Sequence, residues 1–150
     1  MEGEMRRICA LLLAIWLATS LPLVHSAEPS SGRLGAREYK VVFQVSDSEP
    51  QKWYLTLSNA KNVQKELGRK NVQIEVVVYG PGLDMVLLET EAAEKIEEAV
   101  SQGVKIVACE NTMIGRKLTA ADMHSSIGYV KAGVVELMKR QREGWAYIRP

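Results

Sequence analysis

A single cysteine, Cys109, stands where a buried strand is expected to end and a helix to begin. The residues before it, 104–108, are mostly apolar and β-branched, which favours a covered strand. The residues after it, Glu110, Asn111 and Thr112, are polar and favour a helix start. A helix start offers free backbone N–H groups and the positive end of the helix dipole, and both stabilise a thiolate. This spacing therefore makes Cys109 a candidate nucleophile.

Two interpretations of Cys109 remain open at this point. Free cysteine is among the most buried residue types, so Cys109 can be a small core residue without reactivity. If it is reactive, the side chains of Asn111 and Thr112 are candidates to bind the sulfur, with helix capping as their alternative role. Arg116 and His124 are cations that folding can bring to the thiolate, with ordinary surface positions as the alternative.

A glycine-rich turn follows the second predicted strand, which spans residues 72–79. Gly80 and Gly82 flank a proline, and such a tight loop lets backbone N–H groups approach a neighbour closely. The turn lacks the lysine and hydroxyl residue of a phosphate-binding P-loop. Ligands of open α/β sheets bind beyond the carboxyl ends of the strands, so Gly80 and Gly82 join the candidate binding residues.

The N-terminal segment 1–26 has the layout of a secretory signal peptide. Arg6 and Arg7 precede an almost wholly apolar run at 8–24, and Ser26 supplies the small residue expected at a cleavage site. We expect cleavage after Ser26. An uncleaved membrane anchor is the alternative, although the run is short and contains a proline.

Cleavage would leave a periplasmic or secreted protein that begins near Ala27 and has no membrane segment. Residues 27–38 are rich in Ser, Gly and Pro and are predicted to form a flexible linker. Residues 39–150 are predicted to form one domain, which is long enough to build its own core.

Composition excludes several classes of function for this domain. Cys9 and His25 leave with the signal segment, so the mature chain keeps one cysteine and one histidine, which rules out an internal disulfide and a structural zinc site within one chain. The formal net charge of the full chain is +1, and no basic patch of the kind that binds nucleic acid is present. No motif indicates a nucleotide or flavin, and we expect no metal and no cofactor.

Apolar periodicity alternates between strands and helices along the domain. This alternation predicts a three-layer α/β/α sandwich with a mainly parallel sheet of about five strands. A capping box is expected at Ser48 with Gln51, and a second at Thr119 with Asp122. Strands are predicted at 40–45, 72–79, 104–109, 129–130 and 145–148, and helices at 111–117, at 133–142, between Ser48 and Gly68, and between Thr90 and Gly103.

The domain also resembles a known family. Four segments carry the resemblance to the DsrE/DsrF-like family of small α/β proteins: 42–46, 79–82, 108–113 and 144–150. The resemblance implies an association with sulfur relay and intracellular sulfur oxidation. It implies that the cysteine after the third strand, here Cys109, carries the sulfur. It further implies assembly into oligomers, commonly trimers or hexamers.

Two function hypotheses follow from the residues and the resemblance together. In the first, the protein is an exported sulfur carrier or sulfurtransferase-relay component that forms a persulfide on Cys109 and exchanges sulfur with a donor or acceptor protein. In the second, the same fold serves as a non-catalytic module that binds a small ligand or assembles with copies of itself.

Overall fold

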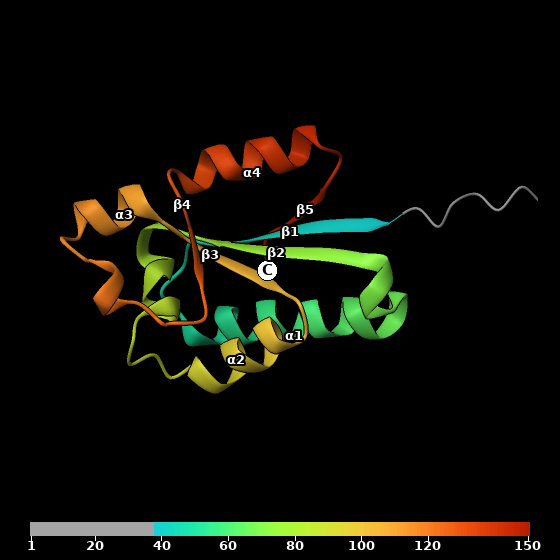
Figure 1. Ribbon diagram of the computed structural model, residues 1–150, viewed down its shortest axis with the longest axis horizontal. Helices are drawn as coiled ribbons and strands as arrows, with labels where there is room; N and C mark the ends of the chain where they lie inside the picture. The colour runs from blue at the N-terminus through green and yellow to red at the C-terminus, as the bar shows by residue number, and fades with distance from the viewer. Residues whose placement is uncertain (1–37) are drawn as a thin grey trace, which may run out of the picture. The chain divides into compact units, whose positions relative to one another are not determined.

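A computed structural model describes residues 38–150. The predicted signal peptide, and the predicted linker apart from Glu38, lie outside the described residues. The domain has the predicted α/β architecture, with one parallel five-stranded sheet between helices (Figure 1). The strands are β1 Tyr39–Val45, β2 Val72–Val78, β3 Lys105–Cys109, β4 Gly128–Val130 and β5 Ala146–Ile148.

The helices cover both faces of this sheet. Figure 1 shows α1 and α2 on one side and α4 on the other, with α3 at one end. Their bounds are α1 Pro50–Leu67, α2 Ala93–Ser101, α3 Glu110–Gly115 and α4 Gly133–Arg142, and short 3-10 segments are η1 Arg69–Asn71, η2 Gly80–Val86 and η3 Ala120–Asp122. Within the part of the chain that the structure describes, no helix is both long and apolar enough to span a membrane.

The strand order is β4-β3-β2-β1-β5. From β1 to β4, each new strand lies beside the previous one and extends the sheet toward the same side. The chain then crosses back over the sheet, and β5 pairs with the free side of β1. The connection for this return contains α4. Since every pairing is parallel, all strands end at the same edge of the sheet: Val45 pairs with Val78, Val78 with Ala108, and Cys109 with Val130. The loops after β1, β2 and β3 are therefore neighbours.

The two faces of the sheet carry cores of unequal size. The face under α1 and α2 holds the main core, which includes Val41, Phe43, Val45, Ile74, Val76, Val78, Trp53, Leu57, Ala60, Ile96 and Ala99. The face under α4 holds a second core cluster of Val42, Val77, Val107, Leu137 and Trp145. Apolar burial of this kind stabilises a fold by roughly 25 cal/mol per Å², so α4 is held by fewer apolar contacts than α1 and α2.

Helix starts confirm one predicted capping box and correct the other. Thr119 and Asp122 form the predicted box, with the Thr119 N–H and hydroxyl both 2.7 Å from Asp122 Oδ2. The box predicted at Ser48 is wrong, because α1 begins at Pro50 with Glu49 as its N-cap and no side-chain cap. A proline lacks an N–H and is pre-set for the first helical position, so Pro50 fixes where α1 begins.

Candidate functional site

Cys109 ends β3 and is at the same time the N-cap residue of α3. Its backbone is extended, with φ −79° and ψ 113°, so the chain turns from strand to helix at this residue. Cys109 is a free cysteine and is 5% exposed. The predicted strand-to-helix turn is therefore present, and the sulfur lies just below the surface at the carboxyl edge of the sheet.

The start of α4 supplies a hydrogen-bond donor to this sulfur. The Gly133 N–H donates to Cys109 Sγ at 3.2 Å. The carbonyl oxygen of Lys131 lies 4.0 Å from Sγ and accepts a hydrogen bond from the Asn111 N–H at 3.2 Å. The connection between β4 and α4 thus covers the sulfur, 22 to 24 residues further along the chain.

Thr112, in the first turn of α3, joins the sulfur to the loop after β2. The Gly80 N–H donates to Thr112 Oγ1 at 3.1 Å. A hydroxyl that accepts this bond keeps its own hydrogen for another acceptor, and the Thr112 hydroxyl is one of the groups that lower the pKa of the Cys109 thiol. Gly80 has φ +57°, in the left-handed region that favours glycine.

The surroundings lower the pKa of the Cys109 thiol. Burial is the largest single effect and raises this pKa, because it disfavours the charged thiolate. The hydrogen bond from the Gly133 N–H, together with the nearby Thr112 hydroxyl and the backbone N–H groups of Thr112 and Asn111, acts in the opposite direction and outweighs it. Cys109 is therefore a partly activated thiol despite its burial.

Of the predicted binding residues, Asn111 and Thr112 act on the sulfur, and Gly80 is connected to it through its hydrogen bond to the Thr112 hydroxyl. Asn111 contributes its backbone N–H, while its side chain is exposed. Gly82 has a packing role instead. A Cβ at this position would lie 2.7 Å from the Val45 carbonyl oxygen, so the close contact between η2 and the end of β1 requires a glycine.

The two candidate cations are engaged elsewhere. Arg116 forms an ion pair with Asp84 at 2.6 Å. His124 is buried, where its Nδ1 accepts a hydrogen bond from the Ser126 N–H at 3.2 Å, and its Nε2 lies 3.8 Å from Glu97. Hydrogen bonds account for the lowered pKa of Cys109, so the expected contribution of Arg116 or His124 finds no support in these contacts.

Two residues of the site were not predicted, Gly133 and Tyr79. The sequence predicts Gly133 only as the start of a helix. No local pattern indicates that its N–H contacts Cys109 at the end of β3. Tyr79 stands between β2 and η2 and packs against the second core cluster. Burial raises the pKa of its phenol, and the neighbouring Tyr147, Asp47 and Cys109 raise it further.

A polar network adjoins Tyr79 at the ends of β1 and β5. The Tyr147 hydroxyl donates to Gln44 Oε1 at 2.6 Å. Arg149 and Lys52 both lie 3.2 Å from Asp47 Oδ1, and hydrogen bonds from these two cations lower the pKa of Asp47 against the effect of burial. The C-terminal segment is thereby tied to the carboxyl end of β1.

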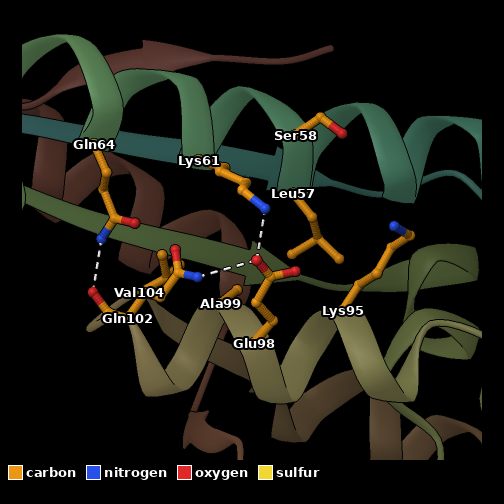
Figure 2. Close-up of a pocket in the computed structure, with 9 residues that line it drawn as sticks. All are labelled: Leu57, Ser58, Lys61, Gln64, Lys95, Glu98, Ala99, Gln102 and Val104. Carbon is orange, nitrogen blue, oxygen red and sulfur yellow. Dashed lines mark hydrogen bonds and ion pairs between the residues drawn. The ribbon is translucent and has the colours of Figure 1, made fainter.

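A cleft with a volume of about 110 Å³ lies between α1 and α2, on the other side of the sheet from α4. Figure 2 shows its polar side chains pairing across the two helices. Lys61 lies 2.6 Å from Glu98, and Gln64 Nε2 donates to the Gln102 carbonyl oxygen at 2.8 Å. Because these polar groups pair with one another and join α1 to α2, they are not available to bind a ligand. We therefore take Cys109 as the candidate site.

Comparison with known proteins connects this site to a family. Residues 39–150 match the DsrE/DsrF-like family. A solved structure of a protein of unknown function from Methanobacterium thermoautotrophicum is 35% identical, with 75% of this chain and 99% of that chain covered and a TM-score of 0.71.

A solved structure of a conserved protein of unknown function from Bacteroides thetaiotaomicron shares the fold. It is 15% identical, with 78% of this chain and 98% of that chain covered and a TM-score of 0.61. No curated protein matches the chain.

Proposed function

Because the chain belongs to the DsrE/DsrF-like family, we propose that it is a sulfur carrier that holds a persulfide on Cys109. The family's association with sulfur relay suggests the chemistry, and the hydrogen bonds around Cys109 suggest the residue. One observation carries the proposal: the only cysteine among residues 38–150 accepts a hydrogen bond from the Gly133 N–H, and its pKa is lowered by donors from two separate segments of the chain, residues 111–112 and Gly133.

Loading is a thiol–persulfide exchange. The Cys109 thiolate attacks the outer sulfur of a donor persulfide, R–S–SH. The new bond joins Sγ to the outer sulfur, the donor's S–S bond breaks, and the donor leaves as the thiolate R–S⁻. Electrons and atoms balance without an oxidant, because the sulfane sulfur only changes carrier. A lowered pKa raises the fraction of Cys109 that is ready to attack at neutral pH.

Unloading uses the same groups in reverse. An acceptor thiolate attacks the outer sulfur of the Cys109 persulfide, and Cys109 leaves as its thiolate. A thiol with a lower pKa leaves faster, and the N–H of Gly133 and the hydroxyl of Thr112 stabilise the charge that returns to Sγ. The site therefore suits a carrier that both accepts and releases sulfur.

The burial of Cys109 favours the rival hypothesis, a non-catalytic module. With 5% of the residue exposed, a partner must reach Sγ past the segment that contains Lys131 and Gly133. If that segment keeps donors away, Cys109 is a core residue, and the fold serves ligand binding or assembly. Alkylation at neutral pH separates the two hypotheses, because a closed structural cysteine reacts slowly.

The proposal also covers location and partners. The pattern of residues 1–26 supports export, so the sulfur donor and acceptor would be met in the periplasm or outside the cell. Exposed apolar residues on α4, namely Val134, Val135 and Met138, support assembly with copies of the same chain, as a trimer or hexamer.

Peptide-resolved mass spectrometry after exposure to polysulfide tests the carrier hypothesis. We expect one or more added sulfur atoms on the peptide that contains Cys109, and their loss on treatment with a small thiol. Cys109→Ser is the matched control, and it should keep the fold because serine is close in size. An unmodified Cys109 peptide under conditions that load a free cysteine would leave the non-catalytic module as the function.

A further inference from the structure

Gly133, which donates to the sulfur, lies directly against the side chain of Tyr79. A Cβ built on Gly133 would lie 3.0 Å from Tyr79 Cδ1, 3.1 Å from its Cβ and 3.2 Å from its Cγ. These distances are shorter than ordinary contacts between carbon atoms, so a methyl group at this position would fit only if the tyrosine moved by a few tenths of an ångström. Gly133 is buried beneath this contact.

Tyr79 is itself held by the sheet. Its backbone N–H donates to the Val45 carbonyl oxygen at 3.1 Å, which extends the pairing of β1 with β2 by one residue. Its side chain packs against the second core cluster. The ring is therefore a fixed surface on which the start of α4 rests.

The Gly133 N–H needs such a support, because the first N–H groups of a helix have no acceptor within the helix. Cys109 Sγ takes this role at 3.2 Å. A hydrogen bond to sulfur weakens when its donor turns away, so the ring that fixes Gly133 also fixes the strength of this bond.

We propose that Tyr79 is a positioning residue for the sulfur site: its ring fixes Gly133 so that the Gly133 N–H points at Cys109 Sγ. The inference deepens the proposed function and rests on it for its biological meaning. The next residue acts on the other side of the sulfur, since the Gly80 N–H orients the Thr112 hydroxyl. The two residues after β2 thus position two groups near the sulfur: Tyr79 positions the Gly133 N–H, and Gly80 positions the Thr112 hydroxyl.

The ring, and not the phenolic hydroxyl, makes the contact with Gly133. The three atoms nearest to the Gly133 position are Cβ, Cγ and Cδ1, which phenylalanine also has. Tyr79→Phe should therefore keep the position of Gly133, whereas Tyr79→Ala should release it. This pair of variants separates positioning from any role of the hydroxyl.

The readout is the pH at which Cys109 becomes half reactive toward iodoacetamide in the full chain, followed on the Cys109 peptide. We expect Tyr79→Phe to leave this midpoint in place and Tyr79→Ala to raise it by about one pH unit or more, the range expected for a lost hydrogen bond to a charged acceptor. An unchanged midpoint in folded Tyr79→Ala, or a raised midpoint in Tyr79→Phe, would overturn the assignment.

If Tyr79→Ala does not fold, a substitution on the other side of the contact tests the same inference. Gly133→Ala places a methyl group against the ring, so it should push the N–H off the sulfur and raise the midpoint. In a Tyr79→Ala, Gly133→Ala double variant the contacts with Cγ and Cδ1 are gone and only the contact with Cβ of residue 79 remains, so the second substitution should raise the midpoint less than Gly133→Ala does in the parent chain. No rise in Gly133→Ala alone, or independent and additive rises, would mean that the ring does not act through Gly133.

Failure of this inference can be distinguished from failure of the proposed function, because the two are measured by different experiments. Persulfide formation measures the carrier activity, whereas the alkylation midpoint measures the state of the thiol. A chain that forms no persulfide but shows the Phe and Ala difference would keep Tyr79 as the residue that positions the donor to Cys109 and would remove the sulfur carrier.

Discussion

At the scale of single residues, the behaviour of Cys109 depends on two opposing effects. Burial disfavours the thiolate, and the Gly133 hydrogen bond together with the donor groups of Thr112 and Asn111 favours it. A neutral donor to a charged acceptor contributes roughly 1.5–3 kcal/mol, so the loss of a single donor can cancel the net shift. The reactivity of Cys109 is therefore expected to depend on neighbours that carry no charge.

Thr112 provides the clearest single test of this dependence. We expect Thr112→Val to raise the pKa of Cys109 by about one unit, because valine has the shape of threonine without its hydroxyl. Thr112→Ser should stay close to the parent chain. The pH profile of Cys109 alkylation gives both values, and equal profiles for the Val and Ser variants would show that the hydroxyl does not act on the sulfur.

The same shift predicts a pH dependence of stability. A thiol whose pKa is lower in the folded chain releases its proton more readily there, so the unfolded chain binds more protons between the two pKa values and stability rises with pH. This contribution is complete above the unfolded value of about 8.5 and is lost as the pH falls through the folded value.

Urea unfolding of the reduced protein and of Cys109→Ser measures this contribution. We expect the difference in unfolding free energy to shift in favour of the parent chain from about pH 6 to about pH 9, by roughly 1.4 kcal/mol for each unit of pKa shift. A difference that stays flat or falls over this range would show that the pKa is not lowered in solution.

The position of Cys109 was predictable, and its donors were only partly so. The β-branched run before it and the polar residues after it are local signals, and they correctly located a strand that turns into a helix. Gly133 joins the site because β4 pairs with β3, which sets Val130 beside Cys109, and α4 begins shortly after Val130. No local pattern holds that information, and Arg116 was a reasonable candidate that pairs with Asp84 instead.

At the scale of elements, α4 is held by a buried ion pair as well as by apolar contacts. Arg140 lies 2.7 Å from Glu75, which is 1% exposed in the middle of β2, and its guanidinium stacks over the Trp145 ring at 4.8 Å. The pKa of Arg140 is raised by Glu75 and other acidic neighbours although burial lowers it. Lys61 and Glu98 form a pair of nearly equal length, 2.6 Å, but on the surface between α1 and α2.

These two pairs allow a matched comparison of burial. We expect Arg140→Met to destabilise the domain by about 3 kcal/mol, because it leaves Glu75 buried with less compensation. Lys61→Met should change the stability little, since water screens an exposed pair. Urea unfolding measures both free energies.

A second substitution identifies the cause. Adding Glu75→Leu to Arg140→Met should recover much of the loss, because the uncompensated charge is gone. A double variant as unstable as the sum of its single variants would instead assign the loss to packing against Trp145.

Element identities were largely predictable, whereas helix starts and strand order were not. Short apolar runs indicated even the three-residue strands β4 and β5, at Tyr129 and after Gly144. The start of α1 was misplaced because Ser48 is a good capping residue in isolation, while Pro50 determines the first helical position. Strand order depends on which surfaces pack together, and the local sequence does not encode that directly.

At the scale of the whole molecule, one group of the exposed apolar side chains in the described domain lies on α4 and β5. Trp145, which comes just before β5, is buried within the same chain in the core cluster under α4. Its neighbours Tyr147 and Ile148 on β5 remain 41% and 39% exposed, and on α4 Met138 is 58% exposed. Because α4 packs against β5, these side chains lie on neighbouring elements and favour a contact between copies of the chain.

Assembly therefore gives the last prediction. We expect the protein to sediment as an oligomer at micromolar concentration, and Met138→Glu to weaken association by roughly 100-fold, because an interface would bury the new charge without a partner. Leu55→Glu is the matched control, since Leu55 is 48% exposed on α1, on the opposite face of the sheet. Sedimentation velocity across a dilution series reads both variants. If the parent chain is a monomer throughout, or if both glutamates act alike, the surface of α4 and β5 is not the contact, and the exposed apolar groups are left for another partner.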